Sequence, residues 1–144
     1  ETGTAASWSV VEFPGVNTTT PIVQSPAGTT GTATSSSQTL SALGSTSNAA
    51  YGWIWHNANE VHTPGTGYNE LHDLGTTENP SAVHSEWLIN TVTVDVSWAT
   101  SASFVHLAIE LAAAAAGDPE SNLVGGKLLD GGLLVGAGNL LGRR

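Results

Sequence analysis

The side chains best suited to chemistry are gathered between residues 56 and 86. Four of the five histidines lie there among several carboxylates, most densely in His56…Glu60-Val61-His62 and in Glu70-Leu71-His72-Asp73. Imidazoles of this kind bind zinc, and carboxylates bind calcium. Neither spacing matches a recognised metal motif such as His-Glu-x-x-His, so the pattern favours a solvated acidic loop region. The alternative is a metal site, which would take calcium at a contact between subunits, with Glu60, Glu70, Asp73 and Glu78 as its candidate ligands.

Signatures of catalysis are missing from the sequence. It contains no Gly-x-Ser-x-Gly elbow and no phosphate-binding glycine loop. Cysteine is absent, and the only lysine is Lys127, near the C-terminal end. A glycosidase pair of carboxylates is recognised only by its separation in space. We therefore predict that the protein is not an enzyme and has no cofactor apart from the calcium considered above.

Three aromatic residues alternate along the stretch Tyr51-Gly52-Trp53-Ile54-Trp55, which predicts a strand with Tyr51, Trp53 and Trp55 on one face. Aromatic residues at this spacing are usually part of a core, so we expect Trp53 and Trp55 to be buried. If they are exposed instead, the three rings form a platform for sugars, as in carbohydrate-binding modules. The polar residues that follow would then bind sugar hydroxyls, namely Asn57, Asn59 and Glu60.

The charge balance restricts the partners of the chain. Twelve acidic residues face three basic ones, which gives a net charge of −9. Direct binding to nucleic acid and anchoring by a polybasic membrane segment both need more Lys and Arg than this. Scarce lysine, no cysteine and abundant Ser, Thr and Gly favour an extracellular location or the surface of a virion. The triplet Asn17-Thr18-Thr19 is an acceptor for an N-glycan at Asn17.

The elements that position these residues are predicted to be strands. Residues 7–13 alternate before the turn at Pro14-Gly15, and a short strand follows Pro21. The segment 25–50, rich in Ser, Thr and Gly, reads as a long loop or as Thr-rich edge strands. Residues 86–98 form the clearest strand, and its expected core face consists of Leu88, Val92, Val94, Val96 and Trp98.

Residues 101–116 fit either a strand or a helix, and the short link before them favours a hairpin with the preceding strand. These elements predict an all-β, antiparallel β-sandwich of about six to eight strands with a jelly-roll-like fold. It occupies residues 1–119 as a single domain. A Gly- and Leu-rich tail follows over residues 120–144.

The tail carries paired leucines that would form a broad apolar face on a helix. Its glycines cost such a helix about 1 kcal/mol each, so it needs a neighbour to pack against. We expect it to contact another subunit or a membrane. The leucines predicted at this assembly contact are Leu128, Leu129, Leu133, Leu134, Leu140 and Leu141.

The run from Trp87 to Ser97, a short link, and the run from Ser103 to Leu111 resemble the last two strands of the jelly-roll coat proteins of small icosahedral RNA viruses. Nodavirus-like coats are the most similar type. An acidic residue near the end of the last strand is matched by Glu110, and the Leu/Gly tail loosely resembles their membrane-active segment. The chain departs from the family in being too short for a whole jelly roll and in having no basic arm that binds RNA.

Composition and resemblance together predict a non-enzymatic structural protein, either a self-assembling coat or an extracellular surface or fibre domain. Its expected partners are copies of itself or other coat subunits. The alternative is a carbohydrate-binding module whose partner is a glycan, bound through Tyr51, Trp53 and Trp55.

Overall fold

A computed structural model describes residues 10–77 and 80–115 of the chain. The ordered elements in these ranges are all strands, and every pairing between them is antiparallel. The predicted all-β, antiparallel sandwich is therefore confirmed. No helix in the described part of the chain is long and apolar enough to cross a membrane. The strands are β1 (Ile22–Gln24), β2 (Thr29–Thr39), β3 (Ala49–His56), β4 (Thr63–Pro64), β5 (Asn69–Thr76), β6 (Ser81–Ile89) and β7 (Thr93–Leu111).

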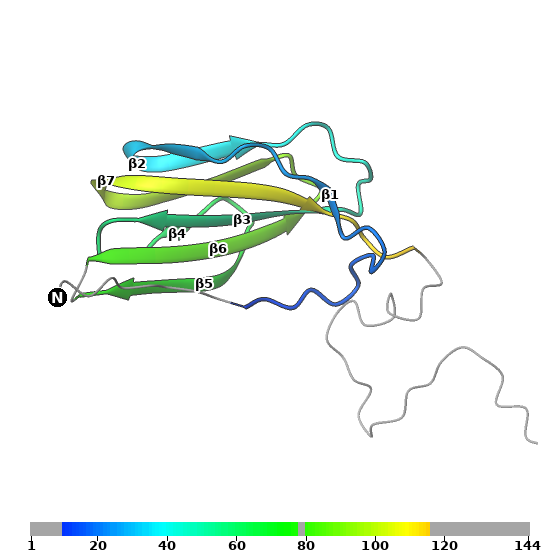
Figure 1. The fold of residues 1–144 in the computed structure, drawn as a ribbon, viewed down its shortest axis with the longest axis horizontal. Helices are drawn as coiled ribbons and strands as arrows, with labels where there is room; N and C mark the ends of the chain where they lie inside the picture. Colours follow the sequence, from blue (N-terminus) through cyan, green and yellow to red (C-terminus); the bar gives the residue numbers. More distant parts are fainter. Residues whose placement is uncertain (1–9, 78–79, 116–144) are drawn as a thin grey trace, which may run out of the picture.

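Strand β7 organises the molecule, because β1, β2, β3 and β4 all pair with it. It is 19 residues long. Its register with β2 shifts between Ala33 and Ser35, opposite residues 98–101 of β7. Figure 1 shows β2 and β7 turning back together at this point, which folds the sheet into two layers. One layer has β5, β6, β3 and the second half of β7, and the other has β4 and the first half of β7.

The core lies between these layers in two apolar clusters. Ile54 of β3 packs with residues on both sides of the β7 bend, namely Val96, Trp98, Ala102 and Phe104. The second cluster contains Leu40, Ala50, Val94 and Ala108. Gly52 marks a close approach of the layers, since an added Cβ there would overlap Cγ1 of Val94.

The predicted strand over residues 86–98 is in fact two strands. β6 ends at Ile89, and β7 begins at Thr93. Between them Asn90 has a φ of 58°, and its backbone N–H donates a hydrogen bond to the Asn48 carbonyl at 3.0 Å. Asparagine adopts this left-handed conformation more easily than most residues. The chain therefore turns at Asn90, although the alternation of side chains in the sequence continues across it. The predicted core face is correct for Val94, Val96 and Trp98, which are buried. It is wrong for Val92, which lies in the turn and is 38% exposed, and Leu88 is only half-buried.

Two segments for which the sequence allowed alternatives, 25–50 and 101–116, contain strands. Residues 29–39 form β2, an edge strand rather than a loop, and residues 101–111 belong to β7. The hairpin expected around residues 99–103 is wrong, because the two halves of β7 pair with β2 and not with each other. Their apolar faces meet across the layers instead, as in the contact between the Trp98 and Phe104 rings at 5.5 Å.

The N-terminal part also differs from the prediction. Residues 10–13 form no strand, although the turn at Gly15 and the short strand β1 are present. The six tail leucines and Glu78 lie outside the described residues.

Candidate functional site

The side chains of strand β3 alternate between the two faces of its layer. Its inward residues Ala50, Gly52, Ile54 and His56 are buried, whereas Tyr51, Trp53 and Trp55 are half-buried on the outward side. The expectation that Trp53 and Trp55 belong to the core is wrong. Because Val94 packs directly on Gly52, the narrow space between the layers accepts small residues at this point and leaves the large rings outside.

Neighbouring strands extend this outward surface. Residues directly opposite each other in an antiparallel pair point to the same side of the sheet. By this register Tyr51 lies between Trp87 and Ile109, Trp53 lies beside Leu107, and Trp55 lies beside Val105. Strand β5 contributes Leu74, opposite Val83. We call the following set the outer aromatic face: Tyr51, Trp53, Trp55, Leu74, Trp87, Val105, Leu107 and Ile109.

The outer aromatic face is uncharged and partly open to solvent. Leu107 is 43% exposed and Leu74 is 52% exposed. In β5, β6 and the second half of β7 the carboxylates stand at alternate positions, on the inward side: Glu70, Asp73, Glu86 and Glu110. An acidic chain has thus kept its charges off one broad apolar surface.

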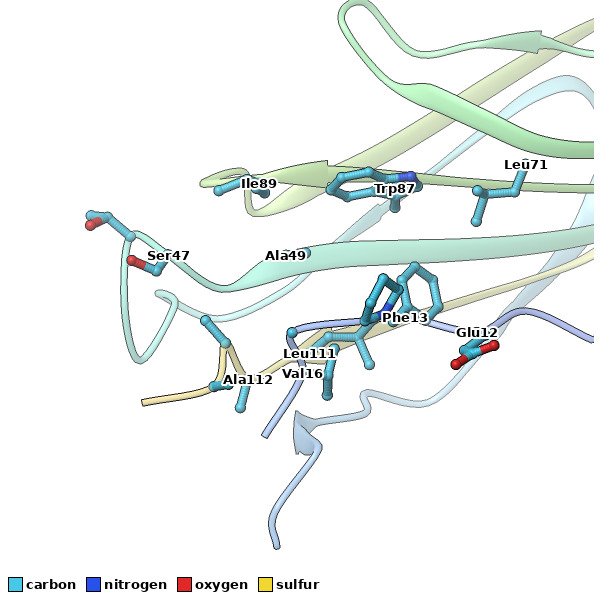
Figure 2. A pocket seen from close by; sticks show the side chains of 15 residues that line it. Glu12, Phe13, Val16, Ser47, Ala49, Leu71, Trp87, Ile89, Leu111 and Ala112 are labelled. Atoms are coloured by element: carbon cyan, nitrogen blue, oxygen red, sulfur yellow. The ribbon is translucent and has the colours of Figure 1, made fainter. Parts of the chain in front are cut away.

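The segment before β1 covers one end of this face. The Phe13 ring packs edge-on against Tyr51, with ring centroids 5.3 Å apart, and against Trp87 at 6.4 Å. A groove of about 680 Å³ lies beside it. In Figure 2, Trp87 and Leu71 line one side of this groove, and Phe13 and Leu111 line the other. The surface therefore continues around Phe13 toward the point where the chain leaves β7, and at this end Glu12 also lines the groove.

A second unusual cluster lies inside the sandwich, where four of the five histidines are buried: His56, His62, His84 and His106. The His62 ring lies 4.5 Å from His56 and 5.1 Å from His84 between centroids. Burial lowers the pKa of His56 to about 4 and that of His106 to about 4, and it also lowers the pKa of His62. The imidazoles of His56, His62 and His106 are therefore neutral near pH 7 and keep a lone pair.

The candidate calcium ligands are dispersed by the fold. Glu60 accepts hydrogen bonds from the backbone N–H groups of Ala99 at 3.0 Å and Thr100 at 2.8 Å, where it supports the β7 bend. Contacts with Thr100 are the main reason that its pKa is lowered. Glu70 is 43% exposed at its side chain and lies 3.8 Å from Nδ1 of His84.

Asp73 belongs to a cluster of possible ligands. Its Oδ1 lies 2.8 Å from Nδ1 of His62, and its backbone position is directly opposite His84. The ligand atoms offered by His62, Asp73 and His84 all lie within 4.8 Å of one another. Sequence spacing could not reveal this set, because it depends on the β5–β6 register and on packing between layers.

Asn17 has a local structural role beside its predicted glycan. Its Oδ1 accepts hydrogen bonds from the backbone N–H groups of Thr19 and Thr20, each at 2.9 Å. This arrangement closes the turn that leads into β1.

Comparisons of the chain with protein-family models, curated proteins and solved structures found no match.

Proposed function

We propose that the protein is a non-enzymatic structural domain that assembles with copies of itself, as a coat or as an extracellular surface domain. The observation that supports this proposal is the outer aromatic face. Surfaces of this composition are typical of protein contacts, in which aromatic residues are enriched and charged residues are depleted. We propose that the partner at this face is a second copy of the chain, which presents the same apolar and uncharged surface.

Energetics favour such a contact. Burying apolar surface contributes about 25 cal/mol per Å². Because no carboxylate of the surrounding strands points outward here, two copies can meet without placing like charges in the contact. A solitary domain would leave Leu74 and Leu107 exposed and the three β3 aromatics only half-buried.

Substitution on the face tests the proposal. Leu107→Ser and Trp53→Ser should each reduce the assembly mass measured by light scattering, while circular dichroism shows an unchanged fold. Val61→Ser is the matched control, because Val61 is 79% exposed in a loop away from this face. A wild-type protein that stays monomeric at high concentration would contradict self-assembly.

The C-terminal tail is proposed to strengthen the same assembly or to meet a membrane, through its paired leucines. Deleting residues 120–144 should leave a folded but smaller species, because both core clusters of the described chain end by residue 108. The measurement is light scattering combined with thermal unfolding. An unchanged assembly mass after the deletion would remove the tail from the contact.

Glycan binding is the second candidate, and the outward orientation of the β3 aromatics favours it. Tyr51, Trp53 and Trp55 follow one another at alternate positions, roughly 7 Å apart along the strand. Sugar rings stack on such a row. If this is the function, Trp53→Ala together with Trp55→Ala should abolish the signal on a glycan array and leave the mass of the protein unchanged.

A further inference from the structure

Three potential metal ligands meet inside the sandwich from separate elements. His62 immediately precedes β4, Asp73 lies in β5, and His84 lies in β6. Asp73 and His84 are paired in the β5–β6 register, so both side chains point inward from one layer. His62 approaches them from the other layer, whose strand β4 pairs with the first half of β7.

The hydrogen bonds of this cluster leave suitable atoms free. Asp73 accepts from the backbone N–H of His62 through Oδ2 at 2.9 Å and contacts Nδ1 of His62 through Oδ1 at 2.8 Å. Nε2 of His62 and Nδ1 of His84 are buried and have no hydrogen-bond partner. The His62 side chain is 0% exposed and the His84 side chain is 1% exposed.

Unpartnered buried nitrogens are unusual, because no hydrogen bond compensates the free energy lost when each nitrogen is removed from water. A bound cation removes this cost by accepting the lone pairs. The described part of the chain contains no Lys or Arg that would repel a cation or pair with Asp73 instead.

We propose that His62, Asp73 and His84 bind one zinc ion between the two layers of the sandwich. Two imidazoles and one carboxylate form a ligand set that zinc accepts, with a fourth position left for another group. Calcium is a poor fit, because it prefers six to eight oxygen ligands. Glu70 is partly exposed, and its Oε2 lies 3.8 Å from the unpartnered Nδ1 of His84, so it can supply the fourth ligand.

The position of the site gives the ion a structural role. It links β5 and β6 of one layer to the segment that enters β4 in the other layer. A chain without cysteine has no disulfide for this purpose. Zinc binding should therefore stabilise the folded domain by mass action, whatever the domain binds at its outer aromatic face.

The test uses the full chain after treatment with a chelator. Isothermal titration with zinc should show one ion per chain, and saturating zinc should raise the thermal midpoint. Cobalt(II) at the same site should give visible absorption bands typical of four-coordinate geometry. Calcium at equal concentration should produce neither effect.

Variants assign the binding to these residues. His84→Gln and Asp73→Asn should each weaken zinc binding by about 10- to 100-fold. His72→Gln is the matched control, because His72 lies in the same strand but is paired with Ser85 on the outward side, and its binding should be unchanged. Because Asp73→Asn preserves shape, it keeps the test valid if His84→Gln fails to fold. Absence of a one-to-one zinc event in the wild-type chain, or equal losses in His72→Gln and Asp73→Asn, would overturn the proposal.

Discussion

Glu110 shows how a chain with almost no basic residues buries a charge. Its carboxylate accepts hydrogen bonds from the backbone of Gly44 at 2.8 Å and from the side chains of Asn48 and Gln24, each at 2.6 Å. Burial by itself raises the pKa of this carboxyl, but the three hydrogen bonds outweigh it and hold the pKa below its usual value. Neutral amides thus replace the cation that would normally face a buried carboxylate.

Replacing Glu110 by Gln should destabilise the fold by about 1–3 kcal/mol, because an amide N–H₂ then faces a donor and one hydrogen bond is lost. The Gln24 amide cannot simply turn over, since its Oε1 already accepts from the Ser41 N–H at 2.9 Å. Urea unfolding measures the change. Glu12→Gln, at an exposed position, is the control and should have no effect. Equal stabilities for the two variants would show that the Glu110 hydrogen bonds contribute nothing.

His106 predicts a dependence of stability on pH. Its pKa is lowered to about 4 mainly by burial and secondarily by His84, and Nδ1 lies 2.9 Å from the Ser36 hydroxyl. An unfolded histidine has a pKa near 6.5, so the unfolded state binds the proton first as pH falls. The contribution of His106 is fully present above about pH 6.5 and is lost progressively toward pH 4, by at most about 1.4 kcal/mol per pH unit.

The comparison of His106→Asn with the wild type tests this dependence. The unfolding free energy of the variant should fall less steeply between about pH 6.5 and pH 4.5, since one titrating group has been removed. Histidine NMR signals of the wild type supply a second measurement. If the His106 ring titrates near pH 6.5 in the folded protein, the predicted burial effect is wrong.

The turn between β6 and β7 decides how these two elements are placed. Asn90 is the only non-glycine residue with a positive φ in the described part of the chain. Asn90→Ala should cost about 1 kcal/mol, because a Cβ without a local polar group disfavours this conformation, whereas Asn90→Gly should be tolerated. Thermal unfolding distinguishes the two. Asn69→Ala, in β5, is a control without a positive φ, and a cost equal to that of Asn90→Ala would refute the backbone argument.

The separation of charge from apolar surface is a property of the whole molecule. With a net charge of −9, copies of the chain repel one another at long range even if the contact itself is uncharged. Added salt screens this repulsion, because the screening length falls from about 30 Å at 0.01 M to about 8 Å at 0.15 M. Self-association should therefore strengthen with salt.

Sedimentation velocity at the two salt concentrations measures this effect, with the Leu107→Ser variant as a control for the outer aromatic face. Association that weakens as salt is added would contradict an uncharged contact. Dissociation by a chelator at pH 8 but not at pH 5 would instead place carboxylates and calcium at the contact, as the acidic composition first indicated.

Local patterns in the sequence determined the strand content of this protein. Alternation identified Val94, Val96 and Trp98 as a buried face and favoured a strand over residues 101–111, since successive strand residues point to opposite sides. Alternation cannot tell which of two apolar faces will be covered. At residues 51–55 the other layer determines which face is buried. Its Val94 lies against Gly52, so Trp53 and Trp55 lie on the outward face.

Only the tertiary structure decided which distant residues meet. The β7 bend requires Glu60, from another part of the chain, to accept the N–H groups of Ala99 and Thr100. Likewise, the approach of His62 to Asp73 and His84 depends on the β5–β6 register and on the packing of two layers. Sequence spacing encodes neither, because such contacts are set by strand pairing and by the distance between layers rather than by neighbours along the chain.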